Sequence, residues 1–319
     1  MPEPTNPLAR PEQDHFFASL DSAVLGDVDV VDESAAPTSL WQDAWRELRH
    51  RVLFWASAAI ILLVIVVAVA PSLFTSVDPR YCDLTNSLGA PGPGHAFGFD
   101  KQGCDVFARV IYGARASVAV GVLTTLVVTL LGATVGAVAG AYGGWFDSLL
   151  SRVTDIFFAI PLVLAAVTVM SIFRSSRTIL TVVLVLGVFG WPQIARITRG
   201  AVMSVKNAEF VTAAKALGVS KPATIVKHLI PNALAPIIVT ATVSLGTFIV
   251  AEATLSFLGI GLPTTVVSWG LDINQAQRQL RAMPSLIFYP SGALALTVLG
   301  FIMMGDAVRD ALDPKARKR

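Results

Sequence analysis

Long apolar runs without charged side chains dominate this sequence and set the strongest constraint on its fold. The runs Leu53 to Ala70 and Ala116 to Tyr142 contain no Asp, Glu, Lys or Arg. A helix needs about 20 apolar residues to cross a bilayer core of about 30 Å, so each run is long enough for a membrane span. Four further spans are expected at 156–173, 178–194, 234–258 and 284–305. The sequence therefore predicts an all-α integral membrane protein with six transmembrane helices.

The composition agrees with this fold class, because charged residues make up only 14% of the 319 residues and hydrophobic residues 54%. Soluble domains carry about 25% charged residues, so this chain has too little charge to cover a soluble surface. A formal net charge of +2, without a basic stripe that interleaves aromatic residues, argues against nucleic-acid binding. Two cysteines are too few for a disulfide-stabilised scaffold.

The distribution of lysine and arginine predicts the orientation of the spans. Loops rich in Lys and Arg stay in the cytoplasm, and sixteen of the 24 basic residues fall on the side of the two termini. The segment 195–232, between the fourth and fifth spans, holds six basic residues and the single acid Glu209. Both termini and this segment are therefore expected in the cytoplasm.

Outside the spans, composition divides the chain into segments. Residues 1–40 hold eight acids, five prolines and one arginine, which predicts a disordered acidic cytoplasmic tail. Residues 41–52 have the pattern of an amphipathic helix, either lying in the membrane interface or extending the first span at 53–73. Residues 74–115 are expected to form a long extracytoplasmic loop. The remaining residues, 116–319, form the core domain with five spans.

Both cysteines, Cys82 and Cys104, lie in the long extracytoplasmic loop. An oxidising compartment permits a disulfide between them, and two free thiols are the alternative. In the second span, Gly132, Gly136 and Gly140 recur every four residues. Small residues at this spacing let membrane helices approach closely, so the ladder predicts helix packing and no chemistry.

The patterns that a membrane enzyme would need are missing from the chain. No Gly-Lys dipeptide occurs, so an ATPase phosphate loop is absent and any ATP coupling requires another polypeptide. No His falls within a predicted span, which argues against an intramembrane serine protease. An aspartyl protease would have to use Asp155 and Asp306, which lie near span ends, where charges are ordinary. We expect no catalytic residue, metal site or cofactor in this chain.

Glu252 is the one acid well inside a predicted span. Acids at that depth are costly and often functional, which makes an ion-coupling site one hypothesis. However, no second ionisable residue accompanies Glu252 in the membrane, and a glycine-rich stretch at 258–262 follows it. A structural role at the end of the fifth helix is the alternative.

The segment between the fourth and fifth spans has the pattern of a helix-turn-helix. Asn207 can cap the first helix, Glu209 suits its first turn, and Gly218 can end it. A second short helix would begin near Pro222 and end at Pro231, before the fifth span. Small outward-facing residues at the turn favour close docking on a partner, and a solvated connector is the alternative.

The same segment resembles the EAA loop of bacterial ABC-importer permeases. The resemblance rests on the run TAAKALG at 212–218 and on HLIPN at 228–232. In that family the loop is the coupling helix that docks on an ATP-binding subunit. The resemblance assigns this docking to Glu209, Thr212, Ala213, Ala214, Lys215, Gly218, His228 and Pro231. Thr212 occupies the position of the motif's Glu, and Glu209 lies one helical turn earlier.

Three further stretches resemble the peptide and nickel branch of that family, in the shorter of its two permease types. They are FGFD, GCDVFAR and IYGAR within 97–115, AEATLSFLG and SWG within 251–270, and GD with RDALDP within 305–314. Cys104 stands where this branch usually has Arg. Cys104 therefore looks like an acquired residue, which draws attention to a disulfide with Cys82.

The resemblance implies a translocation-pore subunit with the type I ABC-importer permease fold, in the inner membrane of a bacterium. It would import oligopeptides or dipeptides together with a second permease, two ATP-binding subunits that hold ATP and Mg, and an extracytoplasmic peptide-binding protein. Closure of the ATPase pair would pull on the 207–231 loops and rotate the spans. The alternatives are a permease for nickel or another small solute, and a stand-alone secondary transporter that uses Glu252.

Overall fold

The computed structural model describes residues 40–174 and 176–312, so residues 1–39 of the predicted disordered tail fall outside these ranges, and Leu40 begins the first helix. Within them the fold is helical, with isolated β-bridges and no longer strand. The helices in chain order are α1 (Leu40–Leu48), α2 (Val52–Val69), α3 (Val106–Tyr142), α4 (Gly144–Ala159), α5 (Leu162–Ile172), α6 (Ile179–Gly190), α7 (Pro192–Val205), α8 (Glu209–Ala216), α9 (Lys221–Thr224), α10 (Ile230–Phe257), α11 (Trp269–Gln277) and α12 (Ser285–Leu312).

The helices long and apolar enough to cross a membrane agree with the expected number of spans. In the described ranges, four qualify alone, namely α2, α3, α12 and the continuous stretch Lys221–Phe257 that ends in α10. The bent pairs α4–α5 and α6–α7 bring the number to six if each pair forms one span. The chain is therefore an all-α membrane protein with up to six spans.

Proline breaks the third and fourth spans, and the predicted ranges 156–173 and 178–194 missed these bends. α4 and α5 meet at 79° beside Pro161, and α6 and α7 meet at 46° beside Pro192. Proline lacks an N–H and its ring clashes with the carbonyl four residues earlier, which favours a bend or an end of the helix at these two positions. The helix before the first bend starts at Gly144, well ahead of the predicted start of that span.

The helix that contains the second span starts earlier than the predicted span, because a side chain caps it at Val106. Asp105 precedes Val106, the first residue of α3, and its carboxylate accepts a hydrogen bond from the Ala108 amide at 2.6 Å. An acidic N-cap satisfies a free amide and suits the positive end of the helix dipole. The extracytoplasmic loop predicted at 74–115 therefore ends before α3, about ten residues earlier than the span predicted from Ala116.

α1 covers most of the amphipathic helix predicted at 41–52. A turn at 49–50 separates it from α2, so it does not extend the first span. Arg51 then precedes α2, and its guanidinium donates to Asp310 of α12 at 2.8 Å. This ion pair links the start of the first span to the end of the last one.

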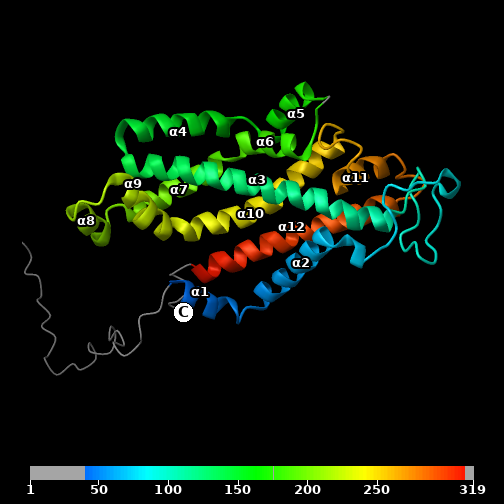
Figure 1. Cartoon of the computed structure of the whole chain (residues 1–319), viewed down its shortest axis with the longest axis horizontal. Coiled ribbons are helices and arrows are strands. Elements are labelled where there is room, and N and C mark those ends of the chain that lie inside the picture. Colours follow the sequence, from blue (N-terminus) through cyan, green and yellow to red (C-terminus); the bar gives the residue numbers. More distant parts are fainter. Residues whose placement is uncertain (1–39, 175, 313–319) are drawn as a thin grey trace, which may run out of the picture. The chain divides into compact units, whose positions relative to one another are not determined.

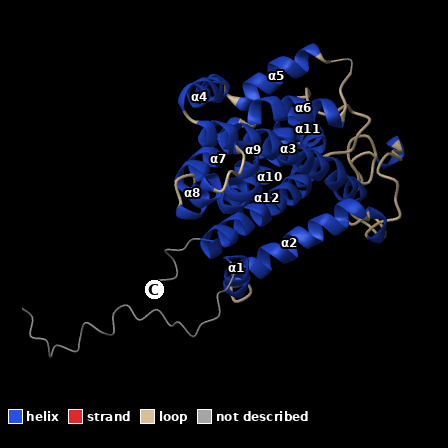
Figure 2. Cartoon of the chain, turned by 60° about the vertical axis from the view of Figure 1, so that its left-hand side comes forward, coloured by secondary structure: helices blue, strands red, loops and turns tan. Residues whose placement is uncertain are grey.

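α3 is the central helix of the bundle and packs along α7, α10, α6 and α2 (Figures 1 and 2). The ladder Gly132, Gly136 and Gly140 faces α7. A Cβ added at any of the three would lie within 3 Å of a backbone oxygen, either of α7 itself or of Trp191, the residue that precedes α7. Close approach is the main source of attraction between membrane helices, because lipid is as apolar as the side chains. The small residues therefore hold the two helices together by letting their backbones meet.

Two features lie at opposite ends of this bundle (Figure 1). The helical loop (residues 207–231), with α8 and α9, lies where α3 and α7 end. The disulfide segment (residues 75–105) lies at the other end, beside α11. The side chains of Val211 and Leu229 are buried in one apolar cluster with Ile194 and Val202 of α7, which anchors the helical loop to the bundle.

Candidate functional site

The first helix of the helical loop, α8, begins one residue later than expected. Ala208 occupies the N-cap position, so the prediction that Asn207 caps this helix is wrong. Glu209 lies in the first turn, where its charge suits the helix dipole. Gly218 ends the helix as predicted, with a φ of +83°, and its amide donates to the Lys215 carbonyl at 3.0 Å. This is a Schellman-type end, which favours glycine because other residues are strained at positive φ.

The second half of the helical loop does not stop before the fifth span. α9 begins with Pro222 in its first turn, as expected, and then passes through a π-helical turn, Ile225–Leu229, into α10. Pro231 lies in the first turn of α10, so the prediction that it ends a helix is wrong. Proline has no N–H to donate to the carbonyl four residues earlier, and here it comes directly after the irregular π-helical turn rather than in a regular α-helical stretch. The Asn232 side-chain amide donates to the His228 carbonyl at 2.7 Å, which satisfies an acceptor at this junction.

The residues assigned to docking differ in exposure. Exposed are Glu209, Thr212, Ala213, Lys215, Gly218 and Pro231, while His228 is half-buried and Ala214 is buried. Ala214 lies three residues after the fully buried Val211, which places both on the face of α8 that meets the bundle. The expectation that the alanines of this helix face outward therefore holds for Ala213 and is wrong for Ala214.

Sequence reasoning missed three large apolar side chains on the helical loop. Phe210 is 46% exposed, Leu217 is 85% exposed and Val226 is 65% exposed. Leu217 is the C-cap residue of α8 and directly precedes the turn glycine, Gly218. The sequence could have indicated all three, because each is an apolar residue within a loop that is otherwise polar and basic. Burial of exposed apolar side chains on binding is favourable, so these three are candidate contacts for a partner.

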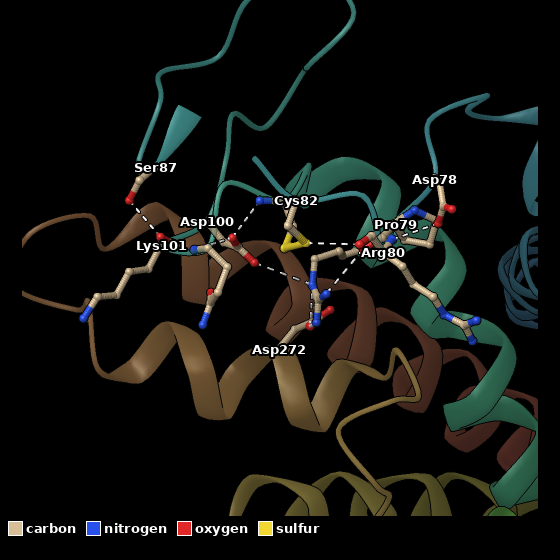
Figure 3. The surroundings of a disulfide bond; sticks show 11 residues. Asp78, Pro79, Arg80, Cys82, Ser87, Asp100, Lys101 and Asp272 are labelled. Carbon is tan, nitrogen blue, oxygen red and sulfur yellow. Dashed lines mark hydrogen bonds and ion pairs between the residues drawn. A yellow bond between two sulfur atoms is a disulfide. The ribbon is translucent and has the colours of Figure 1, made fainter. Parts of the chain in front are cut away.

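At the opposite end, the structure joins Cys82 and Cys104 by a disulfide (Figure 3). The same two residues form a β-bridge, so the bond closes a small folded unit. Asp100 organises this unit, because its carboxylate accepts hydrogen bonds from the amides of Gln102 at 2.8 Å and Cys104 at 2.9 Å. The disulfide segment is therefore held by covalent and hydrogen bonds of its own.

Arg109 of α3 connects the disulfide segment to α11. Its guanidinium donates to a carboxylate oxygen of Asp272 from Nε at 2.9 Å, donates to the Pro79 carbonyl at 3.4 Å, and lies 3.8 Å from the Asp100 carboxylate. Figure 3 shows Asp272 reaching this group from the helix below the segment. Burial raises the pKa of Asp272, and the nearby guanidinium acts in the opposite direction. The sequence hinted at this pair only through an isolated acid between two spans.

Aromatic and arginine side chains extend these links to other helices. Phe97 stacks on Tyr289 of α12 with ring centroids 4.0 Å apart. The indole of Trp269 in α11 donates to the Val110 carbonyl of α3 at 2.9 Å. Arg115 of α3 donates to the Ala68 carbonyl near the end of α2 at 3.1 Å. The end of the bundle that holds the disulfide segment is thus cross-linked between α2, α3, α11 and α12.

Glu252 lies fully buried within α10, close to that end of the bundle. Its Oε1 accepts a hydrogen bond from the Ser256 hydroxyl at 2.8 Å, and the same hydroxyl oxygen accepts one from the Leu262 amide at 3.1 Å. In the described part of the chain its Oε2 has no hydrogen-bond partner and no cation pairs with it. These contacts connect α10 to the turn that follows it, which agrees with the structural alternative.

The acids of the protease alternative lie in ordinary surroundings. Asp155 pairs with Arg196 at 3.1 Å, and both side chains are about half exposed. Asp306 is exposed on α12. Between residues 40 and 312, position 175 aside, no group of three or more His, Cys, Asp or Glu side chains could hold a metal ion.

Comparison with known proteins agrees with this architecture. Residues 132–318 match the family described as binding-protein-dependent transport system inner membrane component, and residues 39–91 match the N-terminal transmembrane domain of oligopeptide transport permease C. The chain is 35% identical to the oligopeptide transport system permease protein OppC of Bacillus subtilis over 297 residues, which cover 93% of this chain and 96% of that protein. It is 37% identical to the glutathione transport system permease protein GsiD of Shigella flexneri over 278 residues, 87% of this chain and 91% of that protein.

A solved structure shares the fold. The inward-facing structure of the MetNI methionine ABC transporter matches with a TM-score of 0.51 at 20% identity, covering 64% of this chain and 96% of the matched chain. At this identity the match supports the type I ABC-importer permease fold alone. Together with the matches over most of the sequence, the helices and loops place this chain in the family of inner membrane components of binding-protein-dependent transport systems, as an ABC-importer permease subunit.

Proposed function

We propose that this chain is one of two permease subunits of an ATP-driven importer of oligopeptides or dipeptides. Its relatives of 35% and 37% identity are permeases named for oligopeptide and glutathione transport, which supports a peptide cargo. Import of nickel or another small solute is the alternative for the cargo. An extracytoplasmic peptide-binding protein would deliver the substrate to the pore formed with the second permease.

The exposed apolar side chains of the helical loop carry the proposal of an ATP-binding partner. Leu217 is 85% exposed although the loop around it is anchored by buried side chains. Burial of such a large apolar side chain against a partner would be favourable, which makes Leu217 a candidate contact. The ATP-binding subunit of the importer is that partner, and Glu209, Thr212 and Ala213 lie exposed on the same loop for polar and close contacts.

The orientation follows from the basic residues. The helical loop and both termini lie in the cytoplasm, where the loop can reach an ATPase, and the disulfide segment lies outside the inner membrane, where disulfides persist. ATP and Mg are held by the partner subunits, and this chain contributes no catalytic residue. Its role is mechanical.

The continuous helix from the loop through the membrane explains how a pull would be transmitted. Lys221–Phe257 runs from α9 through the π-helical turn and α10 as one continuous helix with Pro236 inside it, and Leu229 anchors it in the bundle. When the two ATPases close, the loop moves and this helix moves with it. At its far end, Ser256 connects it to the turn before α11. The movement therefore reaches the extracytoplasmic end and changes the side from which the pore is open.

The test begins with purification of the chain from native membranes in mild detergent, with identification of co-purifying proteins by mass. We expect a second permease and ATP-binding subunits with the wild type, and loss of the ATP-binding subunits with Leu217→Glu. Uptake of labelled dipeptides and oligopeptides, compared with uptake of nickel ions, then decides the cargo. Reproducible recovery of the folded chain alone, or peptide uptake that persists after ATP depletion, would contradict the proposal and favour a secondary transporter that uses Glu252.

A further inference from the structure

A cavity of about 410 Å³ lies between the helical loop and the ends of α3 and α7. Lys206, Lys215 and Lys221 line it, together with Tyr142 and an apolar wall that includes Leu229. Its volume is in the range of small-molecule sites, which are mostly apolar and carry a few polar groups. Three ammonium groups around one cavity make it strongly positive.

The structure holds the three lysines in place without neutralising them. The Lys206 ammonium donates to the Gly140 carbonyl at 3.1 Å, and the Lys215 ammonium donates to the Lys206 carbonyl at 3.3 Å. The Lys221 ammonium lies 5.6 Å from the centre of the Tyr142 ring. Helix-end carbonyls and an aromatic face attract cations but carry no net charge. Each ammonium therefore keeps donors free for an anion, because a lysine has three.

No carboxylate in the described part of the chain pairs with these lysines. The carboxylate of Asp147 in α4 interacts electrostatically with Lys206. Its two carboxylate oxygens accept hydrogen bonds from Arg199 of α7 at 2.5 and 2.7 Å, so the ion pair of Asp147 is made elsewhere. The positive charge of the cavity is thus left for a ligand from outside the chain.

Exposed aromatic rings next to the cavity point to the membrane surface. Tyr142 is 41% exposed, Trp145 is 70% exposed and Phe146 is 52% exposed. The Phe146 ring contacts both others, with centroid distances of 5.9 Å to Tyr142 and 5.3 Å to Trp145. Tyr and Trp gather at the depth of lipid headgroups. Since Tyr142 also lines the cavity, the cavity opens close to that depth.

From this arrangement we infer that the three-lysine cavity binds the phosphate headgroup of an anionic membrane phospholipid. The phosphate is held by the ammonium groups of Lys206, Lys215 and Lys221, and the glycerol and acyl carbons follow the apolar wall and the aromatic rings. Anionic lipids are enriched in the cytoplasmic leaflet, and basic pockets between membrane helices on that side bind their headgroups. The inference rests on the proposed orientation, which places this end of the bundle in the cytoplasm.

Such a lipid would connect the helical loop to the bundle. Lys215 and Lys221 belong to α8 and α9, whereas Lys206 directly follows α7. A single phosphate that contacts all three holds the loop in one position relative to α3 and α7. The lipid therefore stiffens the part of the chain through which an ATPase would act, and anionic lipid would become a requirement for efficient coupling.

Native mass spectrometry of the purified full chain, with whatever subunits co-purify, tests the inference. The protein is exposed to phosphatidylglycerol or phosphatidylcholine, and the lipid retained on the chain is counted. Each lysine at a membrane surface contributes about a fivefold preference for anionic lipid. The triple variant Lys206→Gln, Lys215→Gln, Lys221→Gln should retain roughly a hundredfold less phosphatidylglycerol, with phosphatidylcholine unchanged.

Two matched variants keep the test decisive. The triple change Arg152→Gln, Lys227→Gln, Arg309→Gln removes the same charge from exposed positions and should lower retention far less than the cavity variant does. Replacement of the three cavity lysines by arginine preserves the charge and should keep the lipid. Equal retention by the glutamine variant, or equal loss in the exposed-site variant, would overturn the inference.

Two further outcomes would also overturn it, in favour of another ligand. Displacement of phosphatidylglycerol by inorganic phosphate would identify a site for free phosphate. Loss of the ATP-binding subunits from the glutamine variant, with lipid retention unchanged, would assign the lysines to a protein carboxylate. Because lipid is counted on the protein without transport, failure of the peptide-importer proposal would leave this measurement interpretable. Labelling of a cysteine introduced at Lys227 from either side of the membrane checks the orientation separately.

Discussion

At the end of the bundle that holds the disulfide segment, charged and aromatic side chains pair with one another, whereas the helical loop leaves a large apolar side chain exposed and lysines without a paired acid among the described residues. Arg109 contacts two aspartates and a carbonyl, and Phe97 stacks on Tyr289. On the helical loop, Leu217 is 85% exposed and the three cavity lysines lack a carboxylate partner among the described residues. The charged groups named at the first end are paired within the chain, and those at the second are left for a partner.

This difference shows where the chain is a structural unit and where it is an interface. Removing an interaction whose two partners both belong to this chain should lower the stability of the chain. Removing a side chain that has no such partner should weaken assembly and leave the stability of the chain unchanged. The following substitutions separate these two outcomes, from the largest expected effect to the smallest.

The largest loss of stability is expected from Arg109→Ala. The change leaves the Asp272 carboxylate buried without its cation, and breaking one partner of a buried pair costs about 3–5 kcal/mol. Thermal unfolding in detergent measures the loss. The double variant Arg109→Ala, Asp272→Asn should recover part of it, because no buried charge remains. A loss below about 1 kcal/mol for Arg109→Ala would show that this end is not held by the pair.

Removal of the disulfide by Cys82→Ser with Cys104→Ser should cost less. The bond joins residues 22 positions apart, and closing a loop of about this length stabilises a folded state by about 3 kcal/mol. The loss should stay local, so hydrogen exchange should rise in the disulfide segment and remain unchanged in the helical loop. An equal rise in both regions would mean that the two ends are not independent.

Leu217→Glu should weaken assembly and leave the chain stable. Removing a central apolar contact costs about 2 kcal/mol, or roughly a thirtyfold lower affinity for the ATP-binding subunit. Leu84→Glu is the matched control, because Leu84 is 75% exposed in the disulfide segment at the other end. Titration of the ATP-binding subunit onto the purified permease pair measures both variants. Similar weakening by the control change would contradict the assignment of the interface.

The smallest effect concerns acid pH. Asp83 accepts a hydrogen bond from the Thr85 amide at 2.9 Å, which holds the pKa of this carboxyl below its ordinary value of 3.8. A lowered pKa means that the contribution is present above that value and is lost as the pH falls through the folded pKa. Protection of the Thr85 amide from hydrogen exchange should therefore fall below about pH 4, where Asp83 becomes protonated. Asp83→Asn should remove this pH dependence. The same pH dependence in wild type and variant would show that the carboxylate does not cap the turn.

Much of the fold could be predicted because the bilayer imposes a simple rule on composition. Uncharged runs of sufficient length located the spans, and Gly132, Gly136 and Gly140 indicated a packed face. The bends at Pro161 and Pro192 were missed because proline in an apolar run can either kink a membrane helix or end it. The partner of the glycine ladder, α7, could not be predicted either, since a spacing along one helix carries no information about its neighbour.

The candidate site was predicted in part. The positions of Glu209 and Gly218 in α8 follow from local capping rules, and the structure agrees with them. The burial of Ala214 depends on which face of a short helix meets the bundle, and α8 is too short for its periodicity to decide this. The Arg109–Asp272 pair joins residues 163 positions apart, so no local pattern could reveal it. Helix-capping positions could thus be predicted from the sequence, whereas contacts between residues far apart in the sequence could not.

Hydrogen–deuterium exchange of the purified permease pair, measured with and without its ATP-binding subunits, tests the central claim most directly. The account predicts that the ATP-binding subunits protect the helical loop, with the strongest change around Phe210 and Leu217, while the disulfide segment exchanges at the same rate in both samples. Unchanged exchange in the helical loop, or protection of the disulfide segment alone, would contradict the claim that this loop is the docking surface.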